Sequence, residues 1–212
     1  MRVKRVIDIS RRIYPGMTVW PGDRGVAINQ ESQIDQGAVC NVTSIHMGMH
    51  TGTHVDAPYH FINDGKDLGS LDLLKFIGMV KVFELKVEKC ITRQMVEALP
   101  IDKGDAVFFK TSNSRSIETQ LFSEDYIYLD AEAAAYLVEK GIRTIGVDAL
   151  SIDAFDTAEY LAHKLFLSKE IGIIEGLNLK DVKQGTYFFS CLPLNIPGVD
   201  GSPARAVLLE FE

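Results

Sequence analysis

The chain of 212 residues is 46% hydrophobic and 24% charged, with a formal net charge of -7 at pH 7. This length and composition describe a soluble globular chain that can bury its core in one domain spanning residues 1–212. Acidic residues are spread along the chain without any basic run, which argues against nucleic acid or an anionic membrane as the partner. We therefore expect a small-molecule partner.

The sequence also indicates the cellular compartment of the protein. No apolar stretch has the length expected of a signal-peptide core or of a membrane-spanning helix. Cys40, Cys90 and Cys191 are odd in number and far apart, which fits neither a disulfide framework nor a Cys-x-x-Cys zinc site. We expect reduced cysteines and a cytoplasmic location.

The first predicted elements are strands separated by turns. Residues 5–10 alternate as a strand does, and two Pro-Gly turns then flank Trp20, the only tryptophan. Trp20 is therefore predicted on a loop, where it either anchors the core or walls a pocket. Strands are predicted over 26–32 and 39–50, and the second leads into a dense histidine cluster.

Helices and strands alternate in the rest of the chain. Helices are predicted at 70–75, 92–99, 131–140 and 158–169. Strands are predicted over 80–85, 106–110, 144–147, 171–174, 186–191 and 206–211. The polar segment 111–125 is predicted to be a loop that covers a site, wraps a partner or simply lies at the surface. Roughly nine strands and four helices indicate one α/β domain with a mixed sheet.

The histidine cluster is the main functional signal. Its members are His46, His50, His54 and His60, with Asp56 among them. An extended chain would hold His50 and His54 roughly 13 Å apart, whereas each ligand of a zinc ion lies about 2 Å from the ion. The backbone must therefore turn back between them, and Gly52 permits this because glycine readily adopts positive φ. We predict a strand that ends near His50 and a tight loop that presents His54 and Asp56 to a metal.

Two distant residues are candidates to join this cluster. Glu175 ends the apolar run 171–174, and a carboxylate at the end of a buried strand needs a cation, a hydrogen-bond donor or a metal. His163 lies inside a predicted helix, where a lone histidine is more often structural than a ligand. A ligand set of nitrogen and oxygen without thiolate suits Zn²⁺, Mn²⁺ or Fe²⁺. Asp56 is placed to bridge two ions about 3.5 to 4 Å apart.

Several segments together resemble one known family. The segment His50-Thr-Gly-Thr-His54-Val-Asp56-Ala-Pro-Tyr-His60 resembles the signature of the cyclase-like metal-dependent hydrolases, which include bacterial kynurenine formamidase and isatin hydrolase. The other matching segments, in the family's order, are Trp20-Pro-Gly-Asp, Asp148-x-x-Ser151-x-Asp153, His163 with Glu175-Gly-Leu, Leu192-Pro-Leu, and Asp200-Gly-Ser-Pro-Ala-Arg205-Ala-Val. The resemblance covers almost the whole chain. It implies a barrel-like core of the swivelling β/β/α type and a homodimer or tetramer.

The resemblance also implies a metal centre. According to the resemblance, His50, His54 and Asp56 are ligands of a first ion. Asp56 and Glu175 bridge to a second ion, which His163 also holds. Zinc is the expected metal, as one or two ions, and manganese is the alternative.

The same resemblance implies an amidohydrolase, with a role for the remaining residues. His60 is the general acid/base, Trp20 contacts the substrate, and His46 matches no functional position and is read as structural. The implied reaction is hydrolysis of a C–N amide bond by a water that the metal activates. The substrate is an aryl formamide such as N-formylkynurenine, from tryptophan catabolism, or a cyclic amide. Histidine suits the proton transfer because its ordinary pKa, about 6.5, lies near the working pH.

Two other classes of protein stay open at this point. His54-x-Asp56 with the distant His163 also fits the two-histidine, one-carboxylate triad of non-haem iron oxygenases. That triad leaves Glu175 and two histidines unexplained, and its usual all-β barrel disagrees with the predicted helices. The other alternative is a non-catalytic metal-binding module, whose closed site has no open position for water.

Overall fold

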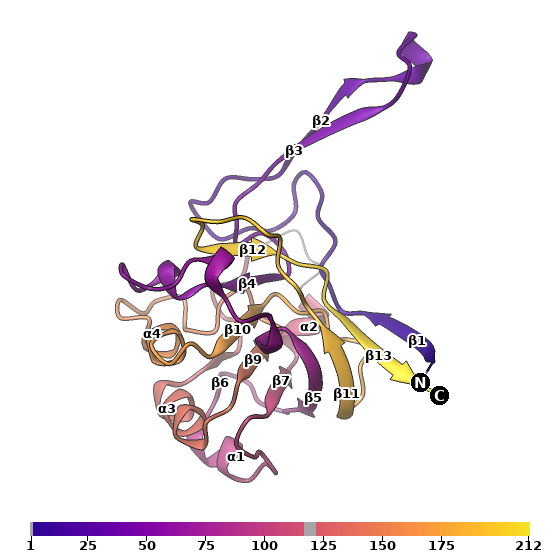
Figure 1. Cartoon of the computed structure of the whole chain (residues 1–212). Coiled ribbons are helices and arrows are strands. Elements are labelled where there is room, and N and C mark those ends of the chain that lie inside the picture. The colour runs from indigo at the N-terminus through magenta and orange to yellow at the C-terminus, as the bar shows by residue number, and fades with distance from the viewer. Residues whose placement is uncertain (1, 117–121) are drawn as a thin grey trace.

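The computed structural model describes residues 2–116 and 122–212. Within these ranges, nine strands form one mixed sheet that curls into a half-barrel, with the helices at 93–97, 131–140 and 161–167 against one face (Figure 1). Its strands are β1 (Val3–Asp8), β4 (His54–Asp56), β5 (Ile77–Glu84), β7 (Ala106–Lys110), β9 (Thr144–Val147), β10 (Gly172–Glu175), β11 (Gly185–Ser190), β12 (Gly201–Pro203) and β13 (Val207–Phe211). Their order across the sheet is β1-β13-β11-β5-β7-β9-β10-β4-β12.

The helices and the remaining strands are short. The helices are α1 (Arg93–Glu97), α2 (Asn113–Ser116), α3 (Ala131–Lys140) and α4 (Leu161–Leu167). Outside the main sheet, β2 (Ala27–Ser32) pairs antiparallel with β3 (Val42–His46), and β6 (Cys90–Ile91) pairs parallel with β8 (Tyr128–Leu129). In the described part of the chain, no helix is both long and apolar enough to cross a membrane.

The centre of the sheet is parallel and buried. β5, β7, β9 and β10 run parallel to one another, and every residue of β9 and β10 is buried. Strands covered on both faces are rich in apolar residues, and these strands follow that rule. Gly146 in β9 is required by packing, because a Cβ there would lie 2.4 Å from a ring atom of Phe108.

Apolar side chains cover both faces of this sheet. On the helical face, Leu137 of α3 and Phe166 of α4 belong to one buried cluster with Ile145 of β9. On the concave face of the sheet, the rings of Phe108 and Phe189 pack edge to face with their centroids 5.1 Å apart. Full burial of one such side chain stabilises the fold by about 1.5 to 3 kcal/mol. The central strands are therefore firmly held, and they fix the position of β4 beside them.

The predicted architecture is confirmed where local signals are strong. The structure has the expected α/β fold with a mixed, barrel-like sheet. The helix predicted at 131–140 is α3: the Asp130 side chain accepts a backbone N–H from its first turn, and Gly141 ends it with φ 71°. The strands predicted over 106–110 and 144–147 are β7 and β9.

Other predicted elements differ in their bounds. The strand expected over 39–50 is limited to β3, because the chain turns after His46. The helix expected at 158–169 is limited to α4, because Tyr160 adopts a left-handed φ of 48° just before it. The helix expected at 70–75 is replaced by two 3₁₀ turns, Leu68–Ser70 and Leu73–Lys75.

The polar segment 111–125, predicted as a loop, contains helix α2 in its described part. The buried carboxylate of Asp148 organises this helix, because it accepts hydrogen bonds from the backbone N–H and the hydroxyl of both Thr111 and Ser114. The rest of the predicted loop includes residues 117–121, which lie outside the described residues.

Strands β2 and β3 form a hairpin that projects away from the body of the molecule (Figure 1). Ile28 and Ile45 are paired across it and are 41% and 48% exposed, and Val39 near its tip is fully exposed. A two-stranded hairpin alone is only marginally stable in water. An exposed apolar ribbon of this kind is a surface suited to association with another molecule.

Candidate metal centre

The short strand β4 carries two of the predicted ligands on one face. Side chains alternate along a strand, so His54 and Asp56 point the same way while Val55 between them is buried in the core. β4 pairs antiparallel with both β10 and β12, and this register places Glu175 opposite His54. The prediction that His54 and Asp56 lie on a loop is therefore wrong, because their backbone is held by two neighbouring strands.

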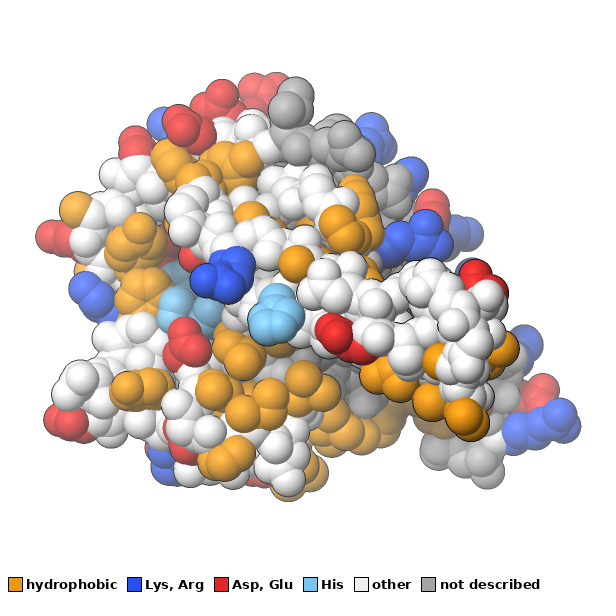
Figure 2. Space-filling model, turned by 90° about the horizontal axis from the view of Figure 1, so that it is seen from above, with side chains coloured by type: hydrophobic (Ala, Val, Ile, Leu, Met, Phe, Trp, Pro, Cys, Tyr) orange, Lys and Arg blue, Asp and Glu red, His pale blue; other side chains and the backbone are white. Residues whose placement is uncertain are grey.

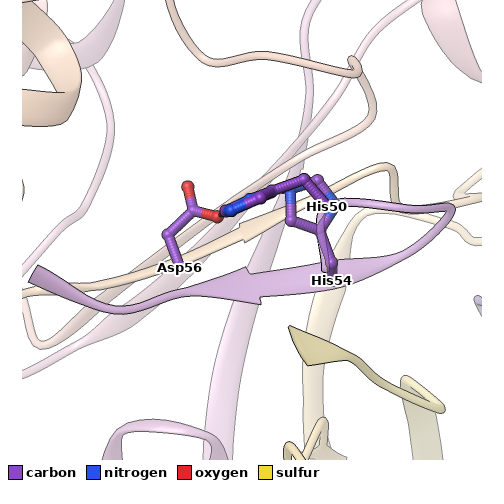
Figure 3. Close-up of side chains that lie close together, drawn as sticks. All are labelled: His50, His54 and Asp56. Atoms are coloured by element: carbon purple, nitrogen blue, oxygen red, sulfur yellow. Dashed lines mark hydrogen bonds and ion pairs between the residues drawn. The ribbon is translucent and has the colours of Figure 1, made fainter. Parts of the chain in front are cut away.

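The turn before β4 brings His50 back over the strand. Gly52 adopts φ 71°, as the predicted reversal between His50 and His54 requires. Gly176 packs against this turn so closely that a Cβ there would lie 2.3 Å from the Gly52 oxygen. As a result, the imidazole of His50 points toward Asp56 (Figure 3).

The two carboxylate oxygens of Asp56 face different groups of side chains. Oδ1 lies 2.9 Å from Nδ1 of His50 and 3.4 Å from Nε2 of His54. Oδ2 lies 3.4 Å from Nε2 of His163, and that nitrogen is 3.1 Å from Oε1 of Glu175. The other Glu175 oxygen, Oε2, is 3.3 Å from Nε2 of His54. This arrangement is suited to a carboxylate that bridges two metal ions.

Contacts outside the cluster orient two of the imidazoles. The Nδ1–H of His54 donates to the carbonyl of Gly52 at 3.1 Å, which leaves Nε2 facing the cluster. Nδ1 of His163 lies 2.6 Å from the Asp153 carboxylate, which also accepts the backbone N–H of His163 at 3.0 Å. Metal-binding histidines commonly use the ring nitrogen opposite the one held by such a partner.

Close opposite charges offset the cost of burying this cluster. Burial alone would lower the pKa of His50, but hydrogen bonds with Asp200 and Asp56 raise it to about 10. Burial likewise opposes the charge on His163, but Glu175 and the other neighbouring carboxylates raise its pKa well above the ordinary value. The pKa values of Asp56 and Glu175 are lowered despite burial, by the imidazoles beside them. Attraction between the partners therefore dominates desolvation here.

His60 lies at the open side of the cluster. It ends the 3₁₀ turn Pro58–His60 that follows β4, and its ring stacks on His50 with centroids 3.9 Å apart. Its side chain is 27% exposed, compared with 3% for His163. Burial is the largest cause of a pKa below the ordinary 6.5. His60 is therefore neutral near pH 7 and can accept a proton.

The cluster forms the floor of a pocket of about 400 Å³, a size typical of small-molecule sites. Trp20, Phe61 and Tyr160 line it together with the histidines. Histidine side chains reach the surface on the face seen from above (Figure 2). Three aromatic rings surround the indole of Trp20 at centroid distances of 5.3 to 6.4 Å: Phe122, Tyr126 and Phe155.

The donor set fits a divalent metal. Oδ2 of Asp56 is buried and makes no hydrogen bond among the described residues, although Nε2 of His163 lies 3.4 Å away. A metal ion beside this oxygen would satisfy it. Ligand atoms of His50, His54 and Asp56 lie within 4.8 Å of one another, and so do those of Asp56, His60 and His163. Imidazole and carboxylate ligands without thiolate suit Zn²⁺, Mn²⁺ or Fe²⁺.

The structure brings the predicted site residues together. They are His50, His54, Asp56, His60, His163 and Glu175, with Trp20 on the wall of the same pocket. His46 is exposed on β3 and belongs to none of the metal-ligand groups found among the described residues.

The sequence does not predict a metal-site role for two carboxylates at the site, Asp153 and Asp200. Asp200 lies 2.9 Å from Nε2 of His50, and Asp153 holds His163. Asp153 also accepts the backbone N–H groups of Ala162 and His163 at the start of α4. The available signal was their place in the segments that match the family.

Fold and site define this protein as a single-domain α/β protein with a cluster of histidines and carboxylates suited to a divalent metal. The Cyclase family model, described as "Putative cyclase", matches residues 7–154. A kynurenine formamidase of Bacillus cereus is 35% identical over 208 residues, covering 98% of this chain and 99% of that protein. A kynurenine formamidase of Bacillus mycoides is 34% identical over the same coverage. The chain belongs to this cyclase family.

Solved structures agree with this assignment. One described as a potential metal-dependent hydrolase with cyclase activity is 36% identical, with a TM-score of 0.86 and 98% of each chain covered. Isatin hydrolase A from Ralstonia solanacearum has a TM-score of 0.85 over 98% of this chain and 92% of that one. At 24% identity, the second likeness concerns the fold alone.

Proposed function

We propose that this protein hydrolyses aryl formamides, with zinc as the expected metal and manganese as the alternative. The coarser statement, that the chain is a metal-dependent amide hydrolase, follows from its cyclase family membership and its kynurenine formamidase relatives. The observation that carries the finer proposal is the placement of Asp56, whose two oxygens face two different groups of ligand atoms beneath an aromatic-walled pocket.

The five ligands divide into two sets in this proposal. His50, His54 and Oδ1 of Asp56, which lies within 3.4 Å of a ring nitrogen of each imidazole, would hold a first ion. His163, Glu175 and Oδ2 of Asp56 would hold a second ion. A metal bound here would lower the pKa of a water molecule and polarise a substrate carbonyl.

His60 moves the proton in the proposed reaction. Its lowered pKa leaves the imidazole neutral at pH 7, so it can take a proton from the attacking water and pass it to the leaving nitrogen. His60 is also more exposed to the pocket than His163. A proton carrier must reach the substrate, whereas a ligand needs only to reach the ion.

The substrate class follows from the wall of the pocket. Trp20 is held edge-on or tilted against neighbouring rings, which keeps its indole in place at the pocket. A fixed aromatic wall favours an aryl group on the substrate through ring packing. N-formylkynurenine, an intermediate of tryptophan catabolism, is the first candidate, and a benzo-fused cyclic amide fits the same wall.

The two rival classes explain less of the site. A two-histidine, one-carboxylate iron centre leaves His50, His60 and Glu175 without a role, although all three meet in the cluster. A non-catalytic module needs a closed site, whereas this cluster lies in a pocket with His60 partly exposed. A hydrolase uses every one of these features.

A substrate panel tests the proposed function. The purified protein, loaded with Zn²⁺ or Mn²⁺, is assayed on N-formylkynurenine, simple aryl formamides, matched alkyl formamides and benzo-fused lactams. We expect hydrolysis of aryl amides with a clear preference over alkyl formamides. Failure to hydrolyse any aryl amide with either metal contradicts the proposal, and substrate-dependent oxygen consumption with Fe²⁺ would favour the oxygenase.

We further propose that the protein is a cytoplasmic homo-oligomer, a dimer or a tetramer. The projecting β2–β3 hairpin supports the oligomer, because its apolar residues Ile28, Ile45 and Val39 are exposed in the single chain. A second copy is a partner with matching apolar surface, since most soluble oligomers are symmetric. The free thiols of the three cysteines support a reducing compartment.

A further inference from the structure

We propose that Asp200 is a positioning residue that fixes the orientation of the His50 and His60 rings at the metal centre. This inference rests on the proposed function of the site. Asp200 immediately precedes β12, and its carbonyl accepts the backbone N–H of Ala57 at 2.9 Å, so its backbone is tied to the chain just after β4.

The first contact of Asp200 fixes the ring of His50. Oδ2 of Asp200 lies 2.9 Å from Nε2 of His50, while Nδ1 of the same ring lies 2.9 Å from Oδ1 of Asp56. When Nε2–H donates to Asp200, Nδ1 is left as the nitrogen that faces Asp56 and the first metal position. His50 would therefore present Nδ1 to a metal, whereas the Nδ1 contacts of His54 and His163 would leave Nε2 as their ligand atom.

The backbone beside Asp200 completes this support. A Cβ at Gly201 would lie 2.6 Å from Cε1 of His50, so the ring rests directly on the glycine backbone. Glycine at this position lets the imidazole lie flat between Asp56 and Asp200. Gly201 thus supplies the backbone surface on which the His50 ring rests, and Asp200 supplies the carboxylate that accepts from Nε2.

The second contact of Asp200 reaches His60. The same oxygen, Oδ2, lies 3.5 Å from Nδ1 of His60, and the His60 ring is stacked on that of His50. At this distance the negative charge of Asp200 acts on His60 by electrostatic attraction, which favours a proton on Nδ1 and an unprotonated Nε2. One side chain therefore orients a metal ligand and the proposed proton carrier together.

Cobalt binding tests this role without any substrate. Metal-free protein is titrated with Co²⁺, and the visible absorption bands and the affinity are compared in wild type, Asp200→Ala, Asp200→Asn and Asp181→Ala. Asp181 is exposed and lies outside the pocket, so it is the matched control. Loss of such an outer carboxylate typically weakens metal binding 10- to 100-fold.

We expect Asp200→Ala to show a 10- to 100-fold weaker first site with altered absorption bands. Asp200→Asn should retain affinity to within several-fold, because its amide oxygen still accepts the Nε2–H, and Asp181→Ala should match wild type. On an active substrate, Asp200→Ala should lower kcat much more than it raises KM, because His60 loses its orientation.

Two results would overturn the inference. Wild-type affinity and spectrum in Asp200→Ala would show that His50 needs no partner at Nε2. An equal loss in Asp200→Asn and Asp200→Ala would indicate that Asp200 binds the metal directly. Both readouts are independent of hydrolysis, so a protein that hydrolyses no aryl amide would contradict the proposed function and leave the cobalt result intact.

Discussion

At the scale of single residues, partners outside the cluster decide which ring nitrogen each histidine presents. The Gly52 carbonyl and the Asp153 carboxylate hold Nδ1 of His54 and His163. These contacts distinguish the two proposed ligands from a surface histidine such as His46, which has no such partner among the described hydrogen bonds. The histidines can be recognised in the sequence, but their partners cannot. The contact between Asp153 and His163, for example, depends on the turn before α4.

His60→Gln tests the proposed division between metal binding and proton transfer. Glutamine is of similar size but does not titrate, so we expect both metal ions to be retained and kcat to fall about 10²- to 10⁴-fold, the usual range for a general acid/base. Metal content by mass spectrometry and steady-state kinetics measure the two effects. His46→Gln is the matched control, and full turnover in His60→Gln would remove His60 from the mechanism.

Asp153→Asn tests the support of His163. The asparagine loses the charge that holds Nδ1 of His163 at 2.6 Å, so we expect zinc affinity at the second position to fall about 10- to 100-fold. Competition with a chromogenic chelator measures this affinity, and exposed Asp156→Asn is the control. Unchanged zinc retention in Asp153→Asn would show that His163 is held by packing alone.

At the scale of elements, the sequence predicts those whose signals are local and misses those that depend on pairing. Helix α3 has its own cap residues, and β7 and β9 are apolar runs, so their bounds could be predicted. Strand β4 has three residues, two of them polar, and is a strand only because β10 and β12 lie on either side. Its partners are more than a hundred residues away in sequence, which no local pattern reveals.

The β2–β3 hairpin carries the prediction about assembly. Ile28 and Ile45 are cross-strand partners, and a lysine at either would place a charge in an apolar interface. We expect Ile28→Lys and Ile45→Lys to reduce the molar mass in light scattering toward that of one chain. Asn29→Lys, on the opposite face of β2, should leave the mass unchanged. A monomeric wild type, or lysine variants of unchanged mass, would contradict the proposed interface.

At the scale of the whole molecule, the site joins segments that are remote in the chain. β4 supplies His54 and Asp56, α4 supplies His163 and β10 supplies Glu175. The unfolded chain has no such preformed site, so metal binding should stabilise the folded protein. The family resemblance predicts that these residues form one site, whereas spacing alone indicates only the segment from His50 to His60.

The stability of the metal-free protein should depend on pH in a defined direction. The pKa of His50 is raised to about 10 in the folded protein, against about 6.5 when unfolded. The folded state therefore binds the proton more tightly, and this stabilisation is complete below pH 6.5 and is lost as the pH rises toward 10. We expect the melting temperature of chelator-treated protein to fall across this range. A flat profile, or a rise, would contradict the ion pairs of His50.

The central claim is that this histidine and carboxylate cluster holds the metal on which amide hydrolysis depends. It is tested most directly by measuring metal content and aryl formamide hydrolysis side by side in the same protein, before chelation, after chelation and after Zn²⁺ or Mn²⁺ is restored. We predict that both are lost together and that both return together, with up to two ions per chain at full activity. Hydrolysis that persists undiminished in protein shown to be free of metal would contradict the account.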